Sequence, residues 1–120
     1  MIANTENLAK VLKVLGDANR LGIVIAIGKG ALSVTEIINT TGLSQTLVSF
    51  HLRALREAAI VTTKRNGPFI HYSITDPALL DILTKLSMAV SKNGSADQQT
   101  PLLRDEIKDL KTKNKKENEE

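Results

Sequence analysis

The sequence predicts a mainly α-helical domain with one small β-hairpin, and three features of the 120-residue chain lead to this fold class. Apolar residues recur with the helical period of about 3.6 through four successive segments before residue 59. The period changes to two across residues 60–74, where Asn66-Gly67 separates two runs rich in β-branched and aromatic residues. A helical period returns after Asp76. The expected order is therefore four helices, a hairpin and a fifth helix in one domain.

The first two helices are expected at Asn4–Leu15 and from Ala18 to about Gly28. Asn4 or Thr5 can cap the first helix, and Gly16 ends it. The second begins at the N-cap Asp17. It is apolar on most sides, so it is expected at the centre of the core.

A helix-turn-helix is expected between residues 33 and 58. Ser33 and Glu36 have the spacing of a capping box, which opens a third helix ending near Thr41. Gly42 can adopt the left-handed conformation that ends a helix, and Ser44 lies where the next N-cap belongs. A short helix, a tight turn and a second helix follow one another in this way in helix-turn-helix proteins.

The fourth helix, which ends near Ala58, has two different faces. Its inward stripe is Val48, Leu52 and Leu55. Its outward side chains are Gln45, Thr46, Ser49 and Arg53. These are types that contact base edges and phosphates, whereas a merely solvated helix usually carries Glu and Lys. An ordinary amphipathic core helix after a turn is the alternative that the pattern alone leaves open.

The hairpin is expected to pair residues 60–65 with residues 69–74, with Lys64 and Arg65 at its tip. Asn66-Gly67 tolerates the positive φ angles of a tight turn. Because Pro68 has no N–H to donate to the ladder, the loop is expected to be longer than two residues.

The fifth helix is expected to begin with Asp76 as N-cap and Pro77 at the first helical position. The first and fifth helices carry more apolar surface than a body of this size needs to cover. Core packing is one explanation, and pairing of two copies across a two-fold axis is the one we favour. The residues predicted for this dimer interface are Leu8, Val11, Leu12, Leu79, Leu83, Leu86 and Val90.

The formal net charge of +3 is unevenly distributed. Residues 1–92 carry a net +4 and residues 93–120 a net −1. Arg53, Arg56, Lys64 and Arg65 cluster beside the helix-turn-helix with only Glu57 opposing them. A local basic cluster at such a motif favours nucleic acid as a partner.

Several function classes are excluded or disfavoured by composition. The chain has no cysteine, which excludes disulfides, thiolate metal sites and cysteine nucleophiles. No basic segment followed by an apolar run opens the chain, and the longest apolar run, residues 23–27, is too short to cross a membrane. The expectation is a cytoplasmic protein without a membrane partner.

The domain is expected to span residues 1–92, followed by a linker and charged tail over residues 93–120. The charge run from residue 111 onward is expected to be disordered. The alternative is that Leu103, Ile107 and Leu110 dock on the dimer or form a partner-binding helix.

Taken together, these segments resemble the ArsR/SmtB family of winged helix-turn-helix transcriptional regulators. The resemblance covers about residues 8–90 and rests on four segments: residues 15–24 (LGDANRLGIV), residues 32–37 (LSVTEI), residues 42–61 (GLSQTLVSFHLRALREAAIV) and residues 71–74 (HYSI). It implies a homodimeric repressor that an inducer releases from operator DNA.

Carried over residue by residue, the resemblance makes residues 44–53 the recognition helix. The residues it implies for DNA binding are Ser44, Gln45, Thr46, Ser49, Phe50, Arg53, Lys64 and Arg65. Phe50 departs from the polar residue expected there, and could contact a thymine methyl group or rest against a neighbouring helix. His51 is expected to pack in the core. Arg20 is expected to have a structural role in preference to a phosphate contact.

The family's known metal sites are not expected here. Residues 32–35 lack the Cys-x-Cys of one site type, and the last helix offers Asp76 and Asp81 without a histidine. His51 and His71 lie on different elements. No metal and no cofactor are therefore expected, with a metal- or haem-responsive repressor that uses a non-standard site as an alternative. An unidentified small-molecule inducer between the first and fifth helices, or no effector, is favoured.

Two other function classes are weighed against DNA binding. An enzyme is disfavoured because Ser49 and His51 lie on different faces of one helix, and no phosphate-binding loop or carboxylate pair appears. A winged-helix module that binds protein would have an acidic or apolar recognition face. Steep weakening of binding by salt would distinguish DNA binding from it.

Overall fold

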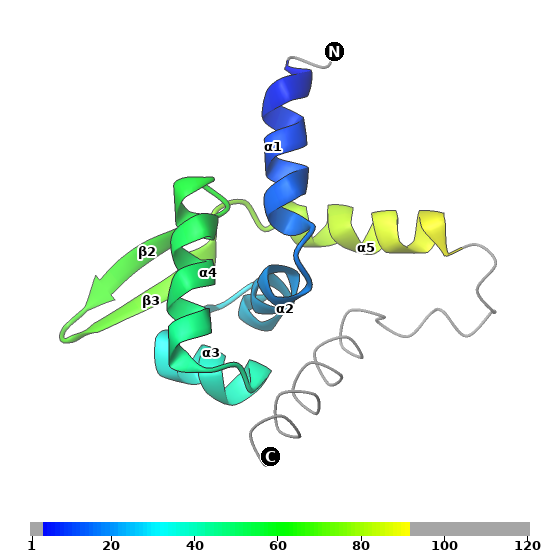
Figure 1. The fold of residues 1–120 in the computed structure, drawn as a ribbon. Helices are drawn as coiled ribbons and strands as arrows, with labels where there is room; N and C mark the ends of the chain where they lie inside the picture. Colours follow the sequence, from blue (N-terminus) through cyan, green and yellow to red (C-terminus); the bar gives the residue numbers. More distant parts are fainter. Residues whose placement is uncertain (1–3, 92–120) are drawn as a thin grey trace.

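The computed structural model describes residues 4–91 and confirms the predicted fold class, a helical domain with a small antiparallel sheet (Figure 1). The helices are α1 (Thr5–Leu15), α2 (Ala18–Ile27), α3 (Val34–Thr41), α4 (Gln45–Glu57) and α5 (Ala78–Val90). The strands are β1 (Ala31–Ser33), β2 (Val61–Asn66) and β3 (Phe69–Ile74). None of the helices described is both long and apolar enough to span a bilayer. The predictions for residues 93–120 lie outside the described range.

The core is built around α2, as the sequence predicts. Ile23 and Val24 are fully buried, and α2 contacts α1, α3, α4 and β3. The other helices and the strands β2 and β3 each add at least one buried apolar side chain, and the turns before α4 and before β2 add one each. These core residues are Leu15, Ile27, Ile37, Leu43, Val48, Leu52, Leu55, Ile60, Val61, Ile74 and Leu83.

Local side-chain bonds set the start and end of the helix-turn-helix. Ser33 Oγ accepts from Glu36 N at 3.2 Å and Glu36 Oε1 accepts from Ser33 N at 2.9 Å, so the predicted capping box is confirmed. Gly42 ends α3 in the left-handed conformation, with φ 78°. Ser44 Oγ accepts from Leu47 N at 3.2 Å and caps α4. The three-residue turn therefore sets the position of α4 relative to α3.

Thr41 reinforces this turn from inside. Its side chain is fully buried, and its hydroxyl donates to Ile37 O at 2.8 Å while accepting from Leu43 N at 3.2 Å. Both hydrogen-bonding roles of a buried hydroxyl are satisfied, so the group stabilises the turn without a desolvation penalty.

Strand β1 is an element that the sequence did not predict. Ala31, Leu32 and Ser33 pair antiparallel with β3, opposite Ser73, Tyr72 and His71, and the sheet order is β1-β3-β2. Three residues are too few to show a period of two, and the capping box at Ser33 dominates the local pattern. The strand ties the start of α3 to the base of the hairpin.

The hairpin loop is shorter than predicted. Asn66 pairs with Phe69, which leaves only Gly67 and Pro68 in the loop. Gly67 has φ 65°, the positive value that the first central position of a type II′ turn requires. The sequence argument from Pro68 was wrong because a proline inside the turn withholds no N–H from the ladder.

The end of α4 places a non-glycine residue in the left-handed region. Ala59 has φ 61°, and the bonds Ile60 N to Leu55 O (2.9 Å) and Ala59 N to Arg56 O (3.0 Å) form a Schellman motif. Glycine is usual at this position because an L side chain there costs about 1–2 kcal/mol.

We therefore expect Ala59→Gly to raise the free energy of unfolding by about 0.5–1 kcal/mol, the left-handed penalty less glycine's larger unfolded-state entropy. Urea denaturation measures the change. The control is Ala58→Gly, one residue earlier at an ordinary φ of −87°, which should destabilise the fold. Equal destabilisation by the two substitutions would contradict the argument.

Helix α5 begins close to the predicted position. The N-cap is Pro77 and not Asp76, because the regular helix starts at Ala78, one residue later than predicted. Asp76 Oδ1 still accepts from Ala78 N at 3.0 Å, just before the helix. Leu79, Leu80 and Leu83 pack on the core. Beyond them α5 extends away from the body, on the side opposite the hairpin in Figure 1.

Candidate nucleic-acid interface

The outward face of α4 presents the predicted base-reading side chains together. Gln45, Thr46, Ser49 and Arg53 are all exposed. On the opposite face Val48 and Leu55 are fully buried and Leu52 is 2% exposed. A helix whose inner face is this well packed holds its outer side chains in a fixed direction, which base readout requires.

Ser44 has a structural duty beside any contact with DNA. Its hydroxyl caps α4, while the residue itself is exposed at the N-terminus of the helix. Helix N-termini carry unpaired N–H groups and a partial positive charge, and these attract phosphate oxygens. The geometry therefore suits Ser44 to a backbone contact at the edge of the groove.

Phe50 is exposed on the same helix. It remains 62% accessible, and its ring meets the His51 ring edge-on, with centroids 5.1 Å apart and planes at 70°. Of the two roles left open by the sequence, the exposed position suits a thymine methyl contact.

A hollow of about 420 Å³ lies between the end of α4 and the sheet. Ser49, Arg53, Arg56 and Tyr72 help to line it. Arg53 Nε lies 3.3 Å from Glu57 Oε2, with both side chains more than two-thirds exposed. A pair this exposed contributes little to stability, so Arg53 can exchange its partner for a phosphate.

The hairpin carries the predicted basic residues at its free end. Lys64 pairs with His71 and Arg65 with Ile70 in the ladder, and both basic side chains are exposed. Phe69 is also exposed there, at 60%, and sequence reasoning missed it because an aromatic residue in a strand is sufficiently explained by β-propensity. Exposed apolar side chains at the end of a basic hairpin suit the minor groove, where such groups wedge between base pairs.

Arg20 has the structural role expected of it. Its Nε donates to Val14 O at 2.6 Å, near the end of α1, and its Nη1 lies 3.4 Å from His51 Nδ1. Asp17 Oδ1 accepts from the backbone N–H groups of Asn19 and Arg20, at 2.8 and 3.0 Å. This cluster joins α1, α2 and α4 behind the proposed DNA-binding face.

Two pKa values in this cluster are shifted. His51 is 5% exposed, which confirms its predicted core position, and burial lowers its pKa; Asp17 opposes this shift and the Arg20 charge adds to it. Partial burial raises the pKa of Asp17, but the Arg20 N–H hydrogen bond and the nearby charges outweigh burial and lower it overall.

The lowered pKa of His51 predicts acid sensitivity near pH 6. Below about pH 6.5 an unfolded histidine takes up a proton that the folded one resists, so stability must fall as the pH falls. A single group of this kind changes the free energy of unfolding by at most about 1.4 kcal/mol per pH unit. Denaturation between pH 7 and pH 5 should show stability falling with pH in wild type and in His71→Gln, and a smaller fall in His51→Gln.

The residues predicted for the dimer interface divide into two groups. Leu8, Leu12, Leu86 and Val90 are about half or more exposed, whereas Val11 and Leu79 are half-buried. Leu83 is only 9% exposed because it packs in the core of its own protomer, so it has little surface to offer a second copy. Ile82, 59% exposed, was missed and extends the stripe of Leu86 and Val90.

No cluster of three or more histidine, cysteine, aspartate or glutamate side chains that could hold a metal occurs among residues 4–91. His51 is buried beside Arg20, and His71 lies in β3.

The chain is similar to known regulatory proteins. Residues 17–63 match the family model described as bacterial regulatory protein, arsR family. The nodulation protein NolR of Rhizobium meliloti is 33% identical over 101 residues, 84% of this chain and 83% of that protein. The arsenical resistance operon repressor of Staphylococcus aureus is 28% identical over 88 residues, 73% of this chain and 85% of that protein.

The fold is also similar to solved structures. The homodimeric winged helix-turn-helix DNA-binding domain of Mb0332 from Mycobacterium bovis superposes with a TM-score of 0.67, covering 79% of this chain and 94% of that one. Its sequence identity is 22%, so this likeness concerns the fold alone.

Proposed function

This chain belongs to the ArsR family of bacterial regulatory proteins, and on that premise we propose a specific way in which it reads DNA as a homodimeric repressor. Two copies pair through the exposed apolar faces of α1 and α5. Each copy places α4 in the major groove and the β2–β3 hairpin on the flanking backbone or minor groove. The two α4 helices then meet half-sites about one helical turn apart.

One observation carries the proposal: the exposed polar face of α4 and the basic hairpin belong to elements that contact each other through a common core. Helix α4 contacts β2, and β2 pairs along its whole length with β3. Gln45, Thr46 and Ser49 supply base contacts, and Arg53, Lys64 and Arg65 supply phosphate contacts. A fixed arrangement of readers and phosphate anchors is what sequence-specific binding needs.

The remaining assignments follow from this role. Residues 1–92 would act as one DNA-binding and dimerisation domain, with residues 93–120 as a linker and charged tail. A regulator of chromosomal DNA acts in the cytoplasm, and binding DNA as a repressor requires no enzymatic step. No metal or other cofactor is part of the proposal.

The test is fluorescence anisotropy of the full chain with its own upstream DNA and with a scrambled duplex, at 50 and 200 mM salt. We expect tight binding to the upstream DNA that falls by about 10³–10⁵ between these salt concentrations if 6–10 phosphates are contacted. The same titration with EDTA and with added zinc checks the effector. Weak, salt-insensitive binding to both duplexes would favour a protein-interaction module, and release by zinc would reveal a non-standard metal site.

A further inference from the structure

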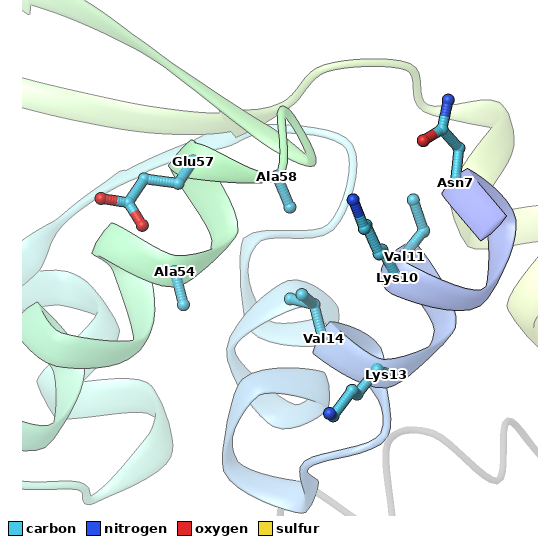
Figure 2. Close-up of a pocket in the computed structure, with 8 residues that line it drawn as sticks. All are labelled: Asn7, Lys10, Val11, Lys13, Val14, Ala54, Glu57 and Ala58. Atoms are coloured by element: carbon cyan, nitrogen blue, oxygen red, sulfur yellow. The ribbon is translucent and has the colours of Figure 1, made fainter.

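A groove of about 620 Å³ lies between α1 and the last turns of α4 (Figure 2). Its volume falls within the range of small-molecule sites. Val11 and Val14 form the α1 wall, and Ala54 and Ala58 form the α4 wall. In Figure 2, Val14 and Ala54 point toward the space between the two helices.

The groove is open because the apolar residues on its α4 side, Ala54 and Ala58, end in methyl groups. Ala54 and Ala58 are four residues apart and therefore on one face of α4. Larger side chains at these two positions would extend toward Val14 and fill the groove. Leu8 and Leu12 do not line the groove, whereas Val11 belongs both to its α1 wall and to the surface predicted for dimerisation, so the two surfaces adjoin along α1.

The mouth of the groove carries unbalanced positive charge. Lys10 and Lys13 line the groove on the α1 side (Figure 2). Glu57 lies on the opposite side, but its carboxylate already pairs with Arg53 at 3.3 Å. Within residues 4–91, neither lysine has a carboxylate within ion-pair distance. Apolar walls with lysines at the rim suit a molecule that has an apolar body and one acidic group.

We propose that this groove binds a small amphipathic organic anion and that its occupancy controls operator affinity. The apolar body lies against Val14, Ala54 and Ala58, and the acid group pairs with Lys10. The control rests on the proposed function, because α1 carries part of the proposed dimer face and α4 carries the base readers. A ligand that prefers one spacing of α1 and α4 shifts the separation of the two reading helices in the dimer.

The first probes are 1-anilinonaphthalene-8-sulfonate, an apolar body with one sulfonate, and N-phenyl-1-naphthylamine, the same body without it. Both are titrated by fluorescence into the full chain without DNA. Ala54→Leu fills the groove and should weaken both probes by about tenfold or more, since a filled cavity leaves no room for the ring. Ala89→Leu, an equal change at an exposed site on α5, should leave both affinities unchanged.

A charge variant tests the acid contact. Lys10→Gln should weaken the sulfonate probe several-fold and spare the neutral probe, while Lys85→Gln on α5 should affect neither. Two-dimensional NMR of the wild type locates the probe independently of any variant. The methyl signals of Val14 and Ala58 should shift on addition of the sulfonate probe, and those of Ala89 should not. Probe affinities unchanged by Ala54→Leu, or shifts confined to α5, would overturn the site.

Operator binding is then measured with and without saturating sulfonate probe. We expect a change in affinity of about 5–150-fold, the usual range of coupling between two sites. No change while the groove is occupied would overturn the regulatory role. If Ile107→Asp, in the full chain, raised probe affinity tenfold, the chain's own C-terminal segment would be the occupant and the small-molecule proposal would fail. Failure to bind operator with the probe still located in the groove would instead count against the proposed function alone.

Discussion

Replacing Ile82 with aspartate is expected to turn the dimer into a monomer and to lower operator affinity by at least about a hundredfold, the loss of a second linked contact. Ile82 is 59% exposed on α5, so a charge there is tolerated by the isolated protomer. In the proposed dimer the same charge would be buried against an apolar face without a partner. A two-fold interface uses the same surface from both copies, so each substitution acts twice.

Sedimentation equilibrium measures the association, and anisotropy with operator DNA measures the functional loss. Thr84→Asp is the matched control, because Thr84 is exposed and lies two positions along α5, toward the other side of the helix. It should remain dimeric. Leu83→Asp cannot serve here, since Leu83 packs in the core and its replacement would unfold the protomer. If Ile82→Asp remained a dimer, the interface would have to lie elsewhere than on this face of α5.

The contrast between Ile82 and Leu83 shows what the helical period on α5 could and could not predict. Both residues belong to one broad apolar stripe, and the stripe correctly predicted more apolar surface than one core can cover. Hydropathy does not distinguish a side chain that faces its own core from one that faces a second copy, since both environments are apolar. Only the path of α5 in the structure, away from the body, shows which of its apolar side chains pack in their own core and which remain exposed.

Caps and turns were predictable where one side chain determines the local geometry. Ser33, Gly42 and Ser44 act through bonds or φ angles that span at most three residues, and each was placed correctly from the sequence. Strand β1 was not predictable because its stability comes from β3, some forty residues further along the chain. The same reasoning applies to Ala59, whose left-handed φ is imposed by the buried neighbours Leu55 and Ile60.

The candidate DNA-binding face followed from the inner face of α4. Once Val48, Leu52 and Leu55 are assigned to the core, helical geometry leaves few residues that can face outward. The hairpin tip offers no such constraint, because residues 64–70 are exposed and no face of the ladder there meets the core. Phe69 therefore looked like an ordinary strand residue in the sequence, although it is largely exposed.

Removal of the base-reading side chains should reduce specificity more than affinity for DNA in general. Gln45→Ala and Ser49→Ala should each weaken operator binding by about 1–3 kcal/mol, the discrimination attributed to a good base contact. Both residues are exposed and Ala favours helix formation, so neither substitution should destabilise the fold. The comparison is the ratio of operator affinity to scrambled-duplex affinity at one salt concentration, which should fall for both variants.

Lys64→Ala provides the contrast, because a phosphate contact carries no sequence information. It should weaken operator and scrambled duplex alike and lower the salt slope by about one unit, with the specificity ratio preserved. Gln45 and Ser49 would be backbone contacts if their variants behaved in this way. Base readout would then fall to Thr46 and Phe50, the other two exposed side chains in the first half of α4 that the sequence assigned to DNA, and Phe50→Ala should reduce binding most at sites with a thymine methyl group.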